Sequence, residues 1–275
     1  MTRATLSEVL LSALQGHRAV AGFVVQGWED ARAYVQAAEA VGAPVILQAG
    51  PGARAHMPLH LMGAMFVHLA EGASVPVVAH LDHGDGLDVC RAAVDAGFTS
   101  VMFDGSALPL AENIALTAEI ASMAHRAGVS IEAELGYVGY HGGAASRGTD
   151  PAEVAQFWAA TRVDALAVSV GNDHLMPTPG ADINLDQLAL IAAAAPGLPL
   201  VLHGGSGIAP ALRARIAQQT TVCKFNIGTE LRQTFGRSLR GVLAADPALF
   251  DRNLILQATA PALQAAAQAA IRSMA

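Results

Sequence analysis

Short apolar runs alternate with longer amphipathic segments along most of the chain. The runs are rich in Val, Ile, Leu and Ala, which is typical of strands buried on both faces of a parallel sheet. The segments between them carry apolar residues at helical spacing, as in 30–41, 88–96, 110–127 and 185–195. Eight such βα units predict an α/β protein with a closed (β/α)₈ or TIM barrel. The predicted strands are 19–25, 44–48, 75–81, 100–104, 129–135, 165–170, 200–203 and 222–226.

The length and composition agree with one barrel and indicate an assembly. The chain has 275 residues, which predicts a single barrel domain with a helical extension over about 253–275. Hydrophobic residues make up 53% of the chain and charged residues only 14%. Because such apolar helices leave more surface to bury than one barrel covers, we expect a homodimer or homotetramer. The extension is predicted to pack on the barrel or on a neighbouring subunit.

Charge and cysteine usage exclude several classes of partner. The net charge is −7 and no cluster of Lys and Arg is present, so we expect no nucleic-acid partner. Met1-Thr2-Arg3 leads into no uninterrupted apolar stretch, and no segment reaches the roughly 20 apolar residues of a membrane span. Cys90 and Cys223 lack CxxC spacing and fit small buried residues. We therefore expect a cytoplasmic protein with no membrane partner.

Three histidines lie at the ends of predicted strands. His83 follows the third strand, His174 the sixth, and His203 ends the seventh. The site of a (β/α)₈ barrel lies where its strands end, so three imidazoles there can converge on one ion. Imidazole is a preferred ligand of Zn²⁺, and three ligands leave one coordination position for a substrate. The pattern predicts one Zn²⁺ per chain and metal-assisted chemistry.

The densest polar cluster is His80-Leu81-Asp82-His83-Gly84-Asp85. Burial of an ionisable group without a partner costs several kcal/mol, so the cluster is expected to face a polar cavity. In that interpretation His83 is a metal ligand and Asp82 is a general acid and base. A solvated turn with an aspartate cap is the other interpretation.

Two acids end neighbouring predicted strands. Asp104 ends the fourth strand and Glu134 lies near the end of the fifth. Because Glu132 and Glu134 share one face of a strand, both should point into the barrel mouth if one does. Asp104 and Glu134 are predicted either to orient a ligating histidine or to hold a second ion, divalent or monovalent. Solvated carboxylates at the barrel rim are the alternative.

Glycine-rich and hydroxyl-bearing turns follow the last two strands. Gly204-Gly205-Ser206-Gly207 follows the seventh strand, and Gly228-Thr229 comes after the eighth. Loops at these places are the usual phosphate site of this barrel, where backbone N–H groups and a hydroxyl bind the anion. A phosphorylated substrate is therefore expected.

With these residues in place, the chain resembles the class II (zinc-dependent) fructose-bisphosphate and tagatose-bisphosphate aldolase family. The resemblance extends from about residue 6 to about residue 239. Six motifs carry it in family order: H-L-D-H-G at 80–84, F-D-G-S at 103–106, E-A-E-L-G at 132–136, T-D-P at 149–151, L-V-L-H-G-G-S-G at 200–207 and N-I-G-T-E at 226–230.

The resemblance implies an enzyme, a carbon-carbon lyase of carbohydrate metabolism. Such an enzyme reversibly cleaves a phosphorylated ketose or a related hydroxyketone into a dihydroxyacetone phosphate-like donor and an aldehyde. By resemblance, the three histidines bind Zn²⁺ and Asp82 moves the proton on the hydroxyl whose carbon becomes the aldehyde. The residues implied to hold the phosphorylated ketone half are Gly204, Ser206, Asn226 and Thr229.

The loop after the fifth strand departs from the family pattern. The family usually has a mobile loop whose acid exchanges the proton at the enediolate carbon, but residues 137–149 contain no carboxylate. His141 is the predicted replacement, because imidazole exchanges protons near neutral pH. Tyr137 and Tyr140 are weaker candidates. The glycines of this loop indicate a mobile lid.

Other departures affect the substrate pocket. Val24 stands where the family has an asparagine, and Gln48-Ala49-Gly50 where it has a serine or threonine. The family motif Gly-Thr-x-His-Gly reads Gly171-Asn172-Asp173-His174-Leu175, and Gly228 replaces an acid. These changes remove hydrogen bonds to sugar hydroxyls and predict an atypical substrate pocket.

Two other functions compete with an aldolase. A metal-dependent barrel hydrolase would use the same kind of ion to activate water. Such hydrolases commonly take two ligands from an H-x-H pair on the first strand, which this chain lacks. A non-catalytic aldolase-like subunit would explain the missing loop acid. That subunit would be expected to lose metal ligands, whereas this chain keeps all three histidines and Asp82.

Overall fold

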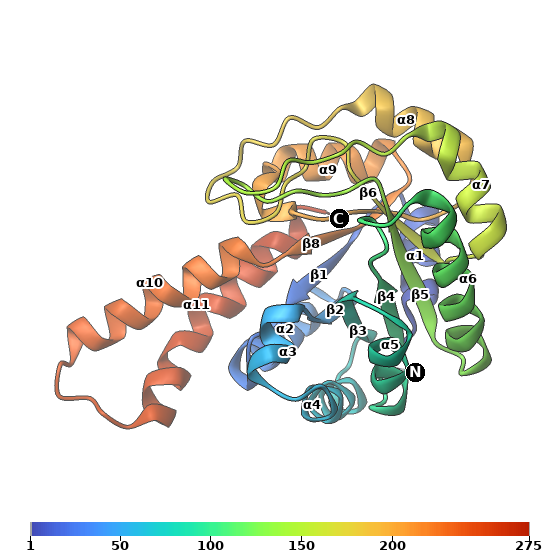
Figure 1. Cartoon of the computed structure of the whole chain (residues 1–275). Coiled ribbons are helices and arrows are strands. Elements are labelled where there is room, and N and C mark those ends of the chain that lie inside the picture. The colour runs from blue at the N-terminus through green and yellow to red at the C-terminus, as the bar shows by residue number, and fades with distance from the viewer. Residues whose placement is uncertain (1, 275) are drawn as a thin grey trace.

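The computed structural model describes residues 2–274 and contains a closed barrel of eight parallel strands (Figure 1). Each strand pairs with the next in sequence, and β8 closes the barrel against β1 with Val20 opposite Lys224. All eight predicted strands are present, so the TIM-barrel prediction is confirmed. The strands are β1 (Val20–Val24), β2 (Val45–Ala49), β3 (Val77–Gly84), β4 (Ser100–Phe103), β5 (Ser130–Leu135), β6 (Ala165–Val168), β7 (Leu200–Leu202) and β8 (Val222–Ile227).

Four strands end earlier than predicted, and β1 is one of them because it ends at Val24, one residue before Val25. β4 ends one residue before Asp104, β6 two residues before Val170 and β7 one residue before His203. At Val170 the reason is visible, because its N–H donates to the side chain of Asn172 instead of continuing the ladder. These residues therefore lie on the rim rather than inside the sheet.

Helices connect the strands and cover the outside of the barrel (Figure 1). The Thr149-Asp150-Pro151 motif has a structural role, since Asp150 caps α7 and Pro151 is its first residue. The helices are α1 (Leu6–Gln15), α2 (Trp28–Val41), α3 (Pro51–His56), α4 (Leu59–Gly72), α5 (Leu87–Asp95), α6 (Leu110–Arg126), α7 (Pro151–Thr161), α8 (Leu185–Ala194), α9 (Pro210–Gln219), α10 (Thr229–Ala245) and α11 (Arg252–Arg272), with a short 3₁₀ helix η1 (Gly205–Gly207).

The N-terminal helix α1 closes one end of the barrel. Its capping box joins Thr5 and Glu8, and its buried face places Leu6 and Leu10 in one apolar cluster with Ile46 and Val78 of the strands. A second, larger apolar cluster fills the space between the strands and the outer helices. With this end filled by apolar side chains, the cavity that contains the polar residues opens at the other end.

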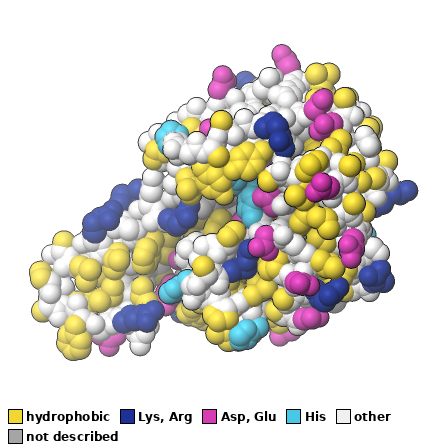
Figure 2. All heavy atoms as spheres, viewed as in Figure 1, with side chains coloured by type: hydrophobic (Ala, Val, Ile, Leu, Met, Phe, Trp, Pro, Cys, Tyr) yellow, Lys and Arg dark blue, Asp and Glu magenta, His cyan; other side chains and the backbone are white. Residues whose placement is uncertain are grey.

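Helices α10 and α11 form an antiparallel hairpin whose tip projects from the barrel (Figure 1). The base of α11 packs on α2, where Leu263, Ala267 and Ile271 are buried. Apolar side chains gather on the projecting hairpin (Figure 2). At its tip, Phe250 is 92% exposed and Leu254 is 53% exposed. The final residue of the predicted extension, Ala275, lies outside the described residues.

The expectation that no segment is long and apolar enough to span a membrane needs correction. Among residues 2–274, α11 is long and apolar enough to cross a membrane by length and composition alone. Its many alanines give it this character, and its buried positions pack against α2 and α10. In this structure α11 is therefore a helix that packs on the rest of the fold.

Candidate active site

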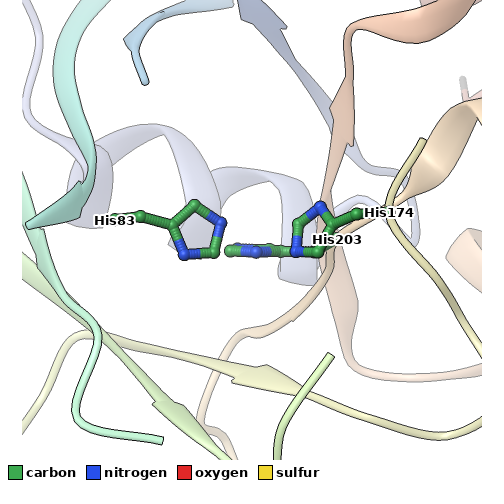
Figure 3. A group of neighbouring side chains, drawn as sticks. All are labelled: His83, His174 and His203. Carbon is green, nitrogen blue, oxygen red and sulfur yellow. The ribbon is translucent and has the colours of Figure 1, made fainter. Parts of the chain in front are cut away.

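The three predicted histidines converge at the carboxyl end of the barrel (Figure 3). The ring centroids of His83 and His203 are 4.7 Å apart, those of His83 and His174 5.1 Å, and those of His174 and His203 5.5 Å. One ring nitrogen from each residue lies within 4.8 Å of the other two. This separation suits three ligands of one metal ion.

Carboxylates orient two of the three rings. Nδ1 of His83 lies 2.7 Å from Oδ2 of Asp104, and Nε2 of His203 lies 3.0 Å from Oε1 of Glu132. A carboxylate that accepts the proton of one ring nitrogen leaves the other nitrogen as a free ligand. Nδ1 of His203 and Oε2 of Glu134 are buried without a hydrogen-bond partner and lie 3.6 Å apart. Buried polar atoms are rarely left unpaired, so this pair fits a bound cation.

An irregularity in β3 lets two adjacent residues face the cavity. In a regular strand, Asp82 and His83 would point to opposite sides of the sheet. The pairing register between β3 and β4 shifts between Leu81 and Gly84, and His83 adopts a left-handed φ of 48°. Bulges of this kind re-aim side chains at functional sites. Arg54 supports the distortion, because its guanidinium donates to the carbonyls of Asp82 and His83 at 2.6 and 3.0 Å.

Two amides hold the carboxylate of Asp82. Nε2 of Gln48 and Nδ2 of Asn226 each donate to Oδ1 of Asp82 at 3.1 Å. The other oxygen, Oδ2, faces Gly50, where a Cβ would lie 3.4 Å away. Sequence reasoning noted Gln48 only as a departure, although a polar residue inside an apolar strand is itself a signal of a buried partner.

A buried charged network lies beneath the histidines. Lys224, the only lysine of the chain, donates to Oε2 of Glu132 at 2.6 Å and lies 3.2 Å from Nε2 of His80. His80 in turn contacts Ser100 at 2.8 Å. All these polar side chains are fully buried, and the ion pair between Lys224 and Glu132 fixes the carboxylate that orients His203.

The ring environments favour different protonation states. Burial opposes a charge on His83, but the carboxylates of Asp82 and Asp104 outweigh burial and raise its pKa to about 9. Burial, followed by the charge on His83, lowers the pKa of His174 to about 4 and holds the pKa of His203 well below its usual range. Two of the three rings are therefore neutral at pH 7, as metal ligands must be.

The two acids near the rings, Glu134 and Asp104, have pKa values that are shifted in opposite directions. Burial, reinforced by the charge on Asp104, raises the pKa of Glu134 to about 8. Burial would raise the pKa of Asp104 as well, but the hydrogen bond and charge of His83 hold it well below its usual range. A cation placed among these groups would remove the proton from Glu134, while Asp104 is ionised without help.

The predicted phosphate residues line the same cavity of about 230 Å³ as His83 and His174. Ser206 accepts hydrogen bonds from the backbone N–H groups of Gly228 and Glu230 at 3.3 and 3.2 Å, so its own hydroxyl hydrogen is free to donate. Gly204 has φ 66°, and a Cβ there would lie 2.2 Å from the carbonyl oxygen of Asp173. The four predicted residues are thus together at the wall of the cavity: Gly204, Ser206, Asn226 and Thr229.

The loop after β5 brings Tyr140, and not His141, to the cavity. Tyr140 lines the cavity and stacks on His174 with the ring centroids 4.9 Å apart. The side chain of His141 is exposed and lies outside the lining, and its backbone N–H donates to the carbonyl of His174. The role of His141 as the proton shuttle stays a prediction, and Tyr140 is the residue of this loop that lines the cavity.

Comparison with known proteins agrees with the geometry. Residues 4–275 match the family model described as fructose-bisphosphate aldolase class-II. The chain belongs to this family. A fructose-bisphosphate aldolase of Geobacillus stearothermophilus is 36% identical over 263 residues, which cover 93% of this chain and 91% of the relative. One from Streptococcus pyogenes is 41% identical over 228 residues, which cover 81% of this chain and 77% of the relative.

Solved structures agree as well. The YdjI aldolase from Escherichia coli K12 superposes with a TM-score of 0.86 at 30% identity, covering 99% of this chain and 97% of that one. The family is class II, so the chain is a metal-dependent aldolase, a lyase that cleaves a phosphorylated ketose. The family match favours neither the barrel hydrolase nor the non-catalytic subunit.

Proposed function

We propose that this class II aldolase uses one Zn²⁺ per chain, held by His83, His174 and His203. The observation that carries the proposal is the buried pair formed by Nδ1 of His203 and Oε2 of Glu134, which have no hydrogen-bond partner. All three proposed ligands are imidazoles, which zinc prefers. The bound ion supplies a positive charge that stabilises the negative charge developing on the ketone half when the carbon-carbon bond breaks.

Asp82 is the proposed acid and base. It takes the proton from the hydroxyl on the carbon that becomes the aldehyde, and returns it in the condensation direction. Oδ1 of Asp82 is occupied by the amides of Gln48 and Asn226, so Oδ2 is the oxygen left for the substrate. The absence of a side chain at Gly50 keeps Oδ2 accessible.

The phosphorylated ketone half is proposed to bind to neutral donors. The free hydroxyl hydrogen of Ser206, the hydroxyl of Thr229 and the backbone at Gly204 line the wall where the phosphate would lie. Backbone and hydroxyl groups at helix starts bind phosphate without a paired cation. The product of this half is a dihydroxyacetone phosphate-like donor.

Asp104 and Glu134 have different proposed roles. The hydrogen bonds of Asp104 with His83 and Ser106 support a role in orienting the ligating ring of His83. Glu134 together with His83 and Asp104 forms a second group of ligand atoms within 4.8 Å of one another, which suits a second divalent or monovalent ion. For the proton at the donor carbon, we propose Tyr140 in place of His141, since Tyr140 lines the cavity.

The assembly and location are also proposals. The exposed apolar side chains at the tip of the α10–α11 hairpin support a homodimer or homotetramer in which this tip is covered by another subunit. Cys90 and Cys223 are buried free thiols, which fits action in the reducing cytoplasm.

A screen of ketose phosphates tests the proposed chemistry. The zinc-loaded enzyme is incubated with each ketose phosphate, and aldehyde release is followed by a coupled reduction. Asp82→Asn is the matched variant, because asparagine keeps the shape but cannot take the proton. It should retain zinc and lower turnover by about 10² to 10⁴. A decrease below threefold would show that another group moves this proton.

A further inference from the structure

Val24, the last residue of β1, points into the cavity of the candidate active site. Phe23 belongs to the apolar cluster between the strands and the outer helices, whereas Val20 belongs to the cluster inside the barrel. Because side chains alternate along a strand, Val24 shares the inner face with Val20. Its partner in β2 is Gln48, whose amide holds Oδ1 of Asp82. Val24 is therefore placed beside the proposed acid and base.

Two glycines flank Val24 and expose its methyl groups on this wall of the cavity. A Cβ at Gly50 would lie 3.4 Å from Oδ2 of Asp82 and 3.7 Å from Cγ1 of Val24. On the other side, a Cβ at Gly228 would lie 3.1 Å from Cγ2 of Val24. The bare backbone of Gly50 is thus what separates the free oxygen of Asp82 from the methyl groups of Val24.

The backbone of this wall is already hydrogen-bonded. The carbonyl of Gly50 accepts from the N–H of Arg54 at 3.0 Å, and the carbonyl of Gly228 accepts from the N–H of Arg232 at 3.0 Å. The N–H of Gly228 donates to Ser206. A substrate hydroxyl placed here would lose its hydrogen bonds to water without gaining a partner. The wall continues at the start of α3 with three residues that have no polar side chain, Pro51, Gly52 and Ala53.

The substrate atoms that meet this wall belong to the aldehyde half. Asp82 acts on the oxygen of the aldehyde carbon, and the proposed donor half extends toward the histidines and Ser206. The next carbon of the aldehyde half, one bond beyond the aldehyde carbon, therefore lies on the side of Gly50 and Val24. Gln26 also lines the cavity, but it borders a second cavity as well, so it marks the outer end of this wall.

We propose that Val24 selects aldehydes whose carbon next to the aldehyde carbon carries no hydroxyl. Such a carbon gains apolar contact with the two methyl groups of Val24, whereas a hydroxyl there would be buried without a partner. The matching substrate for cleavage is a deoxy sugar, a ketose 1-phosphate that lacks the hydroxyl at carbon 5. This inference rests on the proposed function, because it takes Asp82 as the group that acts on the aldehyde oxygen.

Condensation with two matched aldehydes tests the inference. Dihydroxyacetone phosphate is the donor, and the aldehyde is propanal or glycolaldehyde, which carry a methyl group and a hydroxyl, respectively, on the carbon next to the aldehyde. The zinc-loaded wild-type enzyme should have a kcat/KM for propanal about 10- to 100-fold above that for glycolaldehyde, the discrimination that an apolar pocket gives between groups of this size. Consumption of the donor measures both rates, and their ratio tests the proposal without any variant.

Val24→Thr is the matched variant, because threonine has the shape of valine and places one hydroxyl on the wall. It should lower the propanal preference by about tenfold, the effect of one new hydrogen bond to the hydroxylated aldehyde. The KM for the donor should change by less than about threefold, since the donor half binds elsewhere. Val242→Thr makes the same exchange on the α10–α11 hairpin, outside the cavity lining, and should leave the preference unchanged.

Three results would overturn the role of Val24. The first is an equal or higher kcat/KM for glycolaldehyde in the wild type, and the second is a preference that Val24→Thr leaves unchanged. The third is failure to condense either aldehyde by an enzyme that does cleave ketose phosphates. Failure of both condensation and cleavage in the zinc-loaded wild type would instead contradict the proposed function.

Discussion

At the scale of single residues, the site depends on which groups carry protons. His83 has a pKa raised to about 9 by Asp82 and Asp104, against the effect of its burial, and Glu134 has one raised to about 8 by burial. Both groups hold protons at pH 7 before a cation binds. Because zinc needs a neutral imidazole and favours an ionised carboxylate, metal and protons compete for the same site.

Zinc binding to the metal-free protein should therefore release at least one proton per chain at pH 7. The sign follows from the raised pKa of His83: the ring is protonated below about pH 9, so the apparent affinity falls as the pH falls. The change should be about tenfold per pH unit for each proton displaced. Calorimetric titration in buffers of different ionisation enthalpy measures the number of protons. Asp104→Asn should reduce the number of protons released. A zinc affinity that does not change with pH would contradict the protonated state of His83 in the metal-free protein.

The sequence predicted much of the site at this scale because barrel sites occur at strand ends. His83, His174 and His203 could be placed without knowledge of any contact between them. The contact of Gln48 with Asp82 could not, because it depends on how β2 and β3 pair and on the rotation of two side chains. The bulge at His83 likewise has no local sequence signal.

At the scale of elements, the buried network joins β3, β5 and β8 with His203, the residue that follows β7. Lys224 neutralises Glu132, and Glu132 orients His203. The charge pair is fully enclosed, so its members cannot be solvated separately. The network therefore links the stability of the barrel to the geometry of the metal ligands.

Lys224→Met should destabilise the fold by about 3 to 5 kcal/mol, because it leaves the charge of Glu132 buried and unpaired. Chemical unfolding followed by circular dichroism gives the free energy of unfolding. The double variant Lys224→Met, Glu132→Gln should recover part of the loss, since it removes both charges. A loss below about 1 kcal/mol in the single variant would show that the pair is not a stabilising unit.

The loop after β5 provides a second prediction about an element. Tyr140→Phe should slow exchange of the donor's α-proton with solvent by about 10²-fold if Tyr140 moves that proton. His141→Ala is the control from the same loop and should change the exchange less, because its side chain is exposed outside the cavity. Exchange is measured by deuterium incorporation into dihydroxyacetone phosphate. The reverse order of effects would restore His141 as the shuttle.

The path of this loop shows why sequence reasoning fails there. Composition identified a glycine-rich lid, but the choice between neighbouring residues depends on where the backbone turns. Tyr140 and His141 differ because the loop pairs with the segment around His174, a contact more than thirty residues away in sequence. Strands were easier to predict because buried parallel strands have continuous apolar runs.

At the scale of the whole molecule, the α10–α11 hairpin projects from an otherwise compact barrel (Figure 1). Apolar side chains cover much of its surface (Figure 2), with Phe250 exposed at its tip. Phe250→Asp should weaken self-association and shift the mass in solution toward that of one chain, because a charge in an apolar interface is costly. Light scattering after size-exclusion chromatography measures the mass, and Arg237→Met is a control from the flank of the hairpin. A monomeric wild type would contradict the proposed assembly.

The most direct test of the account is a metal titration of activity. Metal-free enzyme receives increasing Zn²⁺, and cleavage of a ketose phosphate is followed at each step. Activity should rise linearly and level off at one Zn²⁺ per chain, and the variant with alanine at residues 83, 174 and 203 should neither bind zinc nor turn over. Full activity in that variant after removal of metal would contradict the central claim that these three histidines hold the catalytic ion.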